Sequence, residues 1–590
     1  NNTAVGYLAL FENTTGTSNT AVGAHALDAI TTAGQCTAIG RNALTNTTAQ
    51  KNTAVGSSAG HTNTSGENCT FVGYTAGYSN TTSNSNSAFG ANALYANSTG
   101  AANTAIGAFA LDNNTTADYN TAVGYAAMDN NTTGHSNTAV GFGSLDANTT
   151  ASANTAVGYN SLTASTTGTN LAALGYQSLK ANTTGSNNTA VGSNAMEANT
   201  TGSQNTSIGD GALNANTTAS NNIAVGYQAL LSNTTGTENI AVGALASDAS
   251  TTASYNVAIG HKALTTCTTG SINVAIGREA MENLNTGTKN VGIGRSALVA
   301  LTTGEENTAV GDAVAASCTT GNTNTAVGNA AMKLTTTASN LVAVGREALY
   351  SNTTGTKGTA IGYQAGYSNT TGASNTSVGY QALYSVTSNG FNTAVGKSCL
   401  NANTAVGNTA VGYDAMEKTT SGSNNTAMGR EALKLNTTGT ENAVFGQNAM
   451  SVCTSGNSNV AVGRDCFSGL TTGSSNTGMG QGCAIFLTTG DNNLLLGQNA
   501  GRSGAPSGNI TTGSNNVCLG DNNITALFCA DTSISSSDAR DKTDVTNFNI
   551  GLDWINALRP VTYRWDRRTW YGTDEEPYGT PDGSKKRTKL

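Results

Sequence analysis

Residues 120–136 read NTAVGYAAMDNNTTGHS, and residues 137–153 read NTAVGFGSLDANTTASA. The two stretches share an Asn-Thr-Ala-Val-Gly opening and an Asn-Thr-Thr segment at the same offsets, which gives the sequence a period of 17. The motif, with variants, ends at Gly6 and recurs as far as Gly520, which gives 31 repeats. Two repeats are one residue short, before Gly56 and before Gly412, and a longer step leads from Gly497 to Gly520. A fixed period of this length is the signature of a stacked repeat architecture, so the repeat decides the fold.

Each repeat is expected to form two short strands joined by two turns. Helix is disfavoured because Gly, Asn, Thr and Val are poor helix formers and the apolar spacing is not 3.6 residues. In Thr-Ala-Val the first and third residues share one face. The Thr slot becomes Ile223 or Val257, and the Val slot becomes Ile106 or Phe89, so we expect both slots to face the interior. The Leu of the Ala-Leu pair, as in Leu27, is the second interior position, and Gly and Asn-Thr-Thr-Gly form the corners.

A single repeat is too small to fold alone, but stacked repeats can share a continuous core. Each strand would pair with its copies above and below, at about 4.8 Å per coil, which gives a rod of roughly 150 Å. Strands paired on both sides have no place for Pro. All four prolines lie past the regular coils, at Pro506, Pro560, Pro577 and Pro581. The prediction is an all-β, parallel β-solenoid of 17-residue coils over residues 1–520.

Two slots of the repeat are nearly always small. One is the Ala before Val, and the other is the Ala before Leu, which becomes Ser144 or Cys399 in some coils. Small residues in register suit either a tight corner inside one coil or a seam between chains. A thin solenoid buries little surface by itself, so trimerisation would add core.

The Ala-Val-Gly-x-x-Ala-Leu cadence of residues 1–520 resembles the head repeats of trimeric autotransporter adhesins. Those repeats are usually shorter than the present one and form left-handed parallel β-rolls in trimers. Similar Asn-Thr-Ala-Val-Gly arrays resemble fibre proteins of tailed phages. The resemblance implies a homotrimeric rod.

The Asn-Thr-Thr segments match the N-glycosylation pattern. The same slot also holds Ile30, Leu301 and Cys267, which favours a half-buried ladder of stacked Asn amides over a sugar coat. The candidate glycosylation residues are Asn13, Asn46, Asn114, Asn131, Asn148, Asn182, Asn199, Asn216, Asn233, Asn352, Asn369 and Asn436.

The sequence offers little for metal, nucleic-acid or membrane chemistry. The ten Cys form no CxxC pair and the four His are scattered, so no metal and no cofactor is expected. Cys466 and Cys483 lie one coil apart, within disulfide reach if stacked, although small buried thiols are the favoured interpretation. The net charge of −8 is spread thinly, which disfavours nucleic acid, and no run is long enough to span a membrane. The chain begins inside a repeat without Met, so we expect an N-terminal segment to be missing.

After Gly520 the composition changes, with a connector at 521–536 and a small α+β module at 537–590. All three Trp lie in this last part. Residues 547–559 have the pattern of a short amphipathic helix, and residues 561–565 alternate like a strand.

The stretch Ser537-Asp538-Ala539-Arg540-Asp541-Lys542, followed by Leu558-Arg559-Pro560-Val561-Thr562-Tyr563-Arg564-Trp565, resembles the intramolecular chaperone domain of phage tailspikes and tail fibres. Members of that family assemble as trimers, align their chains and then cut themselves off. The resemblance implies that Ser537 is the nucleophile, Lys542 the base, and Ser536–Ser537 the bond cut. The competing interpretation is that Ser537 caps a turn and Lys542 is solvated. The chain stops before the family's usual long helices, so the module is expected to be incomplete.

These patterns predict a structural fibre, outside the cell, on a virion or a surface appendage. Its expected partners are its own copies and a cell-surface glycan or receptor, and no metabolic activity is expected beyond autoproteolysis. The alternatives are a trimeric cell-surface adhesin and, more weakly, an ice-binding or glycan-binding solenoid. Ice binding usually needs outward Thr two positions apart, whereas the paired Thr here are adjacent. A polysaccharide-degrading tailspike would need carboxylates brought together only by stacking.

Overall fold

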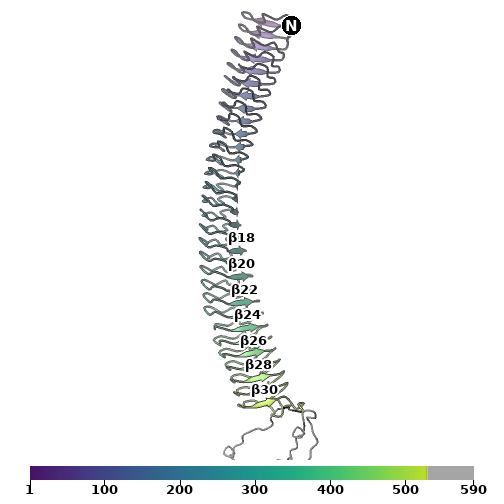
Figure 1. Ribbon diagram of the computed structural model, residues 1–590, viewed down its shortest axis with the longest axis vertical. Helices are drawn as coiled ribbons and strands as arrows, with labels where there is room; N and C mark the ends of the chain where they lie inside the picture. The colour runs from purple at the N-terminus through teal and green to yellow at the C-terminus, as the bar shows by residue number, and fades with distance from the viewer. Residues whose placement is uncertain (527, 529–590) are drawn as a thin grey trace, which may run out of the picture. The chain divides into compact units, whose positions relative to one another are not determined.

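The computed structural model describes residues 1–526 and Phe528 of the 590-residue chain. Across these residues the chain winds into a long column of stacked coils with one three-residue strand per coil (Figure 1). All 31 strands belong to one sheet, and Asn1–Ile524 form one compact unit. The predicted parallel β-solenoid of 17-residue coils is confirmed. The helix and strand predicted within 547–565 lie outside the described residues.

The strands are β1 (Thr3–Val5), β2 (Thr20–Val22), β3 (Thr37–Ile39), β4 (Thr53–Val55), β5 (Thr70–Val72), β6 (Ser87–Phe89), β7 (Thr104–Ile106), β8 (Thr121–Val123), β9 (Thr138–Val140), β10 (Thr155–Val157), β11 (Ala172–Leu174), β12 (Thr189–Val191), β13 (Thr206–Ile208), β14 (Ile223–Val225), β15 (Ile240–Val242), β16 (Val257–Ile259), β17 (Val274–Ile276), β18 (Val291–Ile293), β19 (Thr308–Val310), β20 (Thr325–Val327), β21 (Val342–Val344), β22 (Thr359–Ile361), β23 (Thr376–Val378), β24 (Thr393–Val395), β25 (Thr409–Val411), β26 (Thr426–Met428), β27 (Ala443–Phe445), β28 (Val460–Val462), β29 (Thr477–Met479), β30 (Leu494–Leu496) and β31 (Val517–Leu519).

Neighbouring strands are parallel and in register, with each residue opposite its equivalent in the next coil. In the regular coils Thr121 pairs with Thr138, its counterpart one repeat later. The irregular repeats keep the same register, because Thr37 pairs with Thr53 and Thr393 pairs with Thr409 across the short coils. Insertions and deletions are therefore absorbed by the turns, and the ladder of backbone hydrogen bonds is continuous along the column.

The strands face the opposite way from the sequence-based expectation. In β8 the middle residue Ala122 is fully buried, whereas Thr121 and Val123 are only half-buried, and almost every strand repeats this pattern. The prediction that the Thr and Val slots face the interior is therefore wrong. The physical reason is space. The Leu or Met from the other side of the coil reaches across the narrow interior and leaves room for little more than a methyl group.

The expected second strand is absent from the described coils. The Ala-Leu segment is a run of turns, in which the core Leu has a left-handed backbone, for example φ +51° at Leu111 and +53° at Leu145. Such a backbone cannot continue a strand. The segment still bonds to the next coil, because Leu111 N donates to the Ala127 carbonyl at 3.0 Å and Leu145 N donates to the Ser161 carbonyl at 2.9 Å.

Both small slots lie inside a single coil stack. Ala122 and Ala127 are fully buried and belong to the core, so the tight-corner interpretation holds and these residues form no seam between chains. Where the Ala slot holds a large residue, the neighbouring Leu slots hold small ones, so the core volume stays filled. Phe71 takes an Ala slot where Gly60 and Gly77 take the neighbouring Leu slots. A Cβ on Gly77 would lie 2.2 Å from Phe71 Cδ1, so the ring fills the volume of the missing Leu side chains.

Candidate functional site

The predicted catalytic pair lies outside the described residues. Ser537, Lys542 and the Ser536–Ser537 bond all fall in the range 529–590, so their geometry is not part of the structural account. The described rod carries two Asn ladders, an outward sheet face and a turn face.

The predicted Asn ladder is present in the Asn-Thr-Thr slots. Asn131 Nδ2 donates to Asn114 Oδ1 at 2.9 Å, and Asn148 Nδ2 donates to Asn131 Oδ1 at 2.7 Å. These three side chains are fully buried. Each amide also donates to a carbonyl of its own turn, as Asn131 does to Gly134 O at 2.9 Å. The ladder thus satisfies the buried amide donors by stacking them coil on coil, and Asn148 Oδ1, where the next coil has Ser165 in this slot, has no hydrogen-bond partner.

Two of the candidate glycosylation residues differ from the others. Asn13, in the first coil, is half-buried, and Asn46 is exposed because its coil is one residue short and Thr47 takes the buried slot. The other ten are buried, at 2% exposure or less. Of these candidates, only Asn46 is solvent-exposed in the folded rod, and glycosylation stays the disfavoured alternative, which sugar analysis would test.

A second Asn ladder was missed by the sequence reasoning. It is formed by the Asn that precedes each Thr-Ala-Val, as at Asn120 and Asn137. Asn120 Oδ1 accepts from the backbone N–H of Asn137 at 2.9 Å, and Asn120 Nδ2 donates to Gly134 O at 2.9 Å. Asn fills this slot in most repeats, and this regularity is the signal that could have predicted the ladder. Both ladders join one coil to the next by side-chain hydrogen bonds.

One side of the column is an outward sheet face, which we define as the first and third residues of all 31 strands. Figure 1 shows the labelled strands β18 to β30 in one file along the column. Every third residue is Val, Ile, Leu, Phe or Met, and every first residue is Thr, Ser, Ala, Val, Ile or Leu. Many of the larger side chains are exposed, for example Ile106 at 42% and Met479 at 51%. These 31 described strands thus place no charged or amide side chain on the sheet face.

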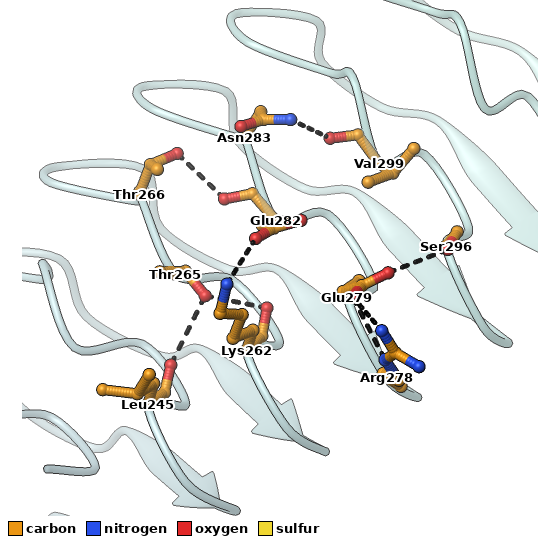
Figure 2. Close-up of polar contacts among 10 residues, drawn as sticks. All are labelled: Leu245, Lys262, Thr265, Thr266, Arg278, Glu279, Glu282, Asn283, Ser296 and Val299. Atoms are coloured by element: carbon orange, nitrogen blue, oxygen red, sulfur yellow. Dashed lines mark hydrogen bonds and ion pairs between the residues drawn. The ribbon is translucent and has the colours of Figure 1, made fainter.

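The rest of each coil forms the turn face, which runs from the glycine after one strand to the Asn before the next. Charged residues gather here and pair between or within coils, as shown in Figure 2. Lys262 Nζ lies 3.6 Å from Glu282 Oε1, and Arg278 lies 2.7 Å from Glu279 Oε1. These pairs are partly exposed, so each contributes little to stability.

An open groove crosses the turn face near the residues of Figure 2, lined by Thr266, Thr268, Asn283, Asn285, Ala300, Thr302 and Thr303. Several of its donors already have partners. Thr266 Oγ1 donates to the Glu282 carbonyl at 3.0 Å and Asn283 Nδ2 donates to the Val299 carbonyl at 2.9 Å. These two donors are therefore already used within the rod.

Aromatic side chains stack along the turn face. Tyr125, Phe142, Tyr159 and Tyr176 follow four successive glycines, with ring centroids 5.3–5.5 Å apart and planes within 13° of parallel. Each inner ring has both faces covered by its neighbours, so the stack offers mainly ring edges to solvent. Its role in the rod is to join coils rather than to provide an open stacking platform.

Three carboxylates stand in one row on successive coils, at Asp112, Asp129 and Asp146. Stacking alone brings them together, as a carboxylate site on a solenoid would require. Burial, together with the charge of Asp129, raises the pKa of Asp112 to about 6. Burial also raises the pKa of Asp129 and of Asp146. Oδ1 of Asp112 and of Asp129 is buried without a hydrogen-bond partner. The ionised row is therefore locally unfavourable, because its carboxylates are partly desolvated and close to one another.

The cysteines of the described rod are free thiols. Nine of them are buried, including Cys466 and Cys483. Burial raises the pKa of Cys267 to about 12, which keeps this thiol protonated and unreactive at neutral pH. Among the described residues, no three His, Cys, Asp or Glu side chains are placed to hold a metal. Nor does that part of the chain contain a helix of the length and hydropathy needed to cross a membrane.

A continuous rod of in-register parallel coils, with one uncharged and one charged side, defines a fibre-like structural protein. Residues 537–587 match the family model described as the chaperone of endosialidase. A search of the curated proteins found no match for this chain. The C-terminal match and the solenoid of 17-residue coils together fit a tail fibre with a C-terminal chaperone domain.

Proposed function

We propose that the chain is the rod of a homotrimeric tail fibre or surface filament, displayed on a virion or a surface appendage outside the cell. Its C-terminal segment would guide assembly of three chains and then cut itself from the rod. A receptor or cell-surface glycan would be bound by the assembled fibre rather than by an enzyme site on the rod.

The observation that carries the proposal is the unbroken axial ladder. Each of the 31 strands pairs in register with the next, and buried Asn ladders run in the same direction. Hydrogen bonds aligned with the long axis resist extension and bending, which is the mechanical task of a fibre. An arrangement of this kind suits a spacer.

The repeat also explains why an assembly module would be needed. Coils are nearly equivalent, so two chains could pack one coil out of step at little cost. A segment without repeats, outside the rod, removes that ambiguity. The chaperone match at 537–587 stands in the right position in the sequence for this task.

The proposed cleavage uses Ser537 as nucleophile and Lys542 as base, at the Ser536–Ser537 bond. A Ser hydroxyl needs a base to become nucleophilic, and a Lys that is desolvated in a trimer interface can lose its proton near neutral pH. The assembled trimer would therefore switch cleavage on, which orders the events as alignment first and release second.

The experiment is native mass spectrometry of the full-length precursor chain. We expect a three-chain particle whose chains end at Ser536, and Ser537→Ala should leave the precursor intact while it still forms trimers. Ser533→Ala, at a nearby serine on the other side of the proposed cut, is the matched control and should be processed normally. Normal processing of the Ser537→Ala precursor would refute the dyad, and a single-chain particle would refute the homotrimer.

A further inference from the structure

The sheet face is a long uncharged strip, in which every third residue is apolar and most first residues are Thr. It comprises two outward positions in each of 31 strands, none of which holds a charged or amide residue. Exposed examples occur along the whole rod, from Ile39 at 41% through Ile208 at 41% to Leu519 at 42%. The chain does use charge elsewhere, because its ion pairs stand on the turn face. The lack of charge is therefore a property of this one face.

The area of the face is that of a stable interface. Two outward residues of a strand span about 7 Å and successive coils are about 4.8 Å apart, so the strip covers on the order of 1,000 Å². The apolar third residues cover about half of the strip, roughly 500 Å², which is at the upper end of the apolar patches that soluble monomers expose. Stable complexes bury about 800 Å² on each partner. The strip alone reaches that size.

The repeat of the sheet face along the rod indicates which partner would cover it. A globular partner would cover a few coils and leave the rest exposed. A partner that covers all 31 strands must be equally long and must repeat at the same spacing, and a second copy of this chain meets both conditions. We propose that copies of this chain pack through their sheet faces in a parallel homotrimer, with the columns of first and third residues turned toward a common axis. This inference rests on the proposed fibre, and it adds which surface makes the assembly.

The decisive test is solvent access at single introduced cysteines in the full chain. Ile208→Cys lies on the sheet face, in strand β13. The matched control is Thr201→Cys, which lies on the turn face just before the same strand and is exposed. In a lone chain both introduced cysteines would react readily with a maleimide, because both positions are exposed. The described native cysteines are buried and should add little background labelling. We expect Ile208→Cys to react at least tenfold more slowly than Thr201→Cys in the assembled particle, and to react as fast once the particle is dissociated.

A second variant tests the energetics of the same surface. Ile208→Asp with Ile223→Asp places two charges on neighbouring strands at positions that are 41% and 39% exposed in one chain. The coils should still form, because both side chains point outward, while the particle should lose assembly or dissociate at markedly lower temperature. Thr201→Asp with Thr218→Asp, on exposed turn-face positions, should leave assembly unchanged.

The outcomes separate this inference from the proposed function. A three-chain particle in which Ile208→Cys and Thr201→Cys react equally fast would overturn the sheet-face interface and leave the homotrimer standing. A single-chain particle would overturn the homotrimer, and the interface with it. A three-chain particle with slow labelling at Ile208→Cys supports both.

Discussion

At the scale of single residues, the glycine after each strand is the most constrained position of the coil. Gly124 has φ +139°, and a Cβ built on it would lie 2.4 Å from the carbonyl oxygen of Gly141 in the next coil. Two backbones thus approach too closely for any side chain, and the backbone adopts a conformation that L-residues rarely reach. The same contact recurs up the column, which is why the glycine is so regular in the repeat.

Replacing Gly124 with Ala should therefore open the rod locally. The strained backbone and the clash should cost about 3 kcal/mol, since a carbonyl cannot move aside as a flexible side chain can. Amide hydrogen exchange in strands β7 to β9 should accelerate by roughly a hundredfold. Gly504→Ala is the control, because nothing lies within 4 Å of its Cβ, and its exchange should match that of the unaltered chain. Equal exchange in both variants would contradict this account of the glycine column.

At the scale of elements, each coil is specified by how its one strand fits its turns. The strand gives a small residue to the interior, and the turn gives a large one. At Phe71 the strand gives the large residue, and Gly60 and Gly77 give the small ones. This exchange makes these coils different from the other repeats. Such exchanges mark particular coils within a chain of near-identical repeats. If the register shifted by one coil, Phe71 would face Leu94, and two large side chains would compete for one space.

The size exchange leads to a paired prediction. Phe71→Ala should cost about 3–5 kcal/mol of local stability, as truncation of a buried Phe usually does. Adding Gly77→Leu should recover part of that loss, because Leu is the usual occupant of this slot at the same left-handed φ. Phe391→Ala, which truncates a side chain that is 70% exposed, should change little. Local hydrogen exchange measures all three, and no recovery in the double variant would contradict the exchange of volume.

The Asp112, Asp129 and Asp146 row predicts a pH dependence. The folded-state pKa of Asp112 is raised from 3.8 to about 6, so the folded rod binds this proton more tightly than the unfolded chain does. Stability contributed by the row is therefore present at acid pH and lost as the pH rises through about 6. The loss is on the order of 1 kcal/mol after allowance for solvent screening of these half-buried groups.

The measurement compares the native chain with a variant carrying Asp112→Asn, Asp129→Asn and Asp146→Asn. The two should have similar local stability at pH 4, and the variant should be more stable at pH 7.5. The other carboxylates are common to both chains and cancel in the difference. A difference that does not change with pH would show that the row does not titrate as described.

At the scale of the whole molecule, stability is expected to be a sum over neighbouring coils rather than a property of one core. Each coil contacts mainly the coils before and after it. The core divides into two clusters, which end at Ala365 and begin again at Ala382. Between them Gly366 occupies a Leu slot beside Ala360 and Ser377, so this coil has no large side chain in either of these core slots.

Deleting one whole coil should therefore be tolerated. Removal of residues 121–137 joins Asn120 directly to Thr138 and restores the motif at the junction. The rod should keep its thermal midpoint within a few degrees and shorten by about 4.8 Å. Removal of residues 121–129 alone, about half a coil, should destroy the register and lower the midpoint strongly. Circular dichroism melts and small-angle scattering check both, and similar melts for the two deletions would contradict a coil-by-coil fold.

The sequence by itself determined the period, the parallel stacking, the glycine corner and the buried Asn ladder, because each repeats at a fixed spacing and depends on contacts between equivalent residues. Only the tertiary structure decided which side of the strand faces inward and how many strands each coil has. The sequence could not settle the facing of Thr-Ala-Val, because alternation makes both faces equally consistent with a three-residue strand. That choice depends on interior width, which the Leu on the far side sets. As a result, the apolar columns expected in the core became the outward surface through which we propose the copies assemble.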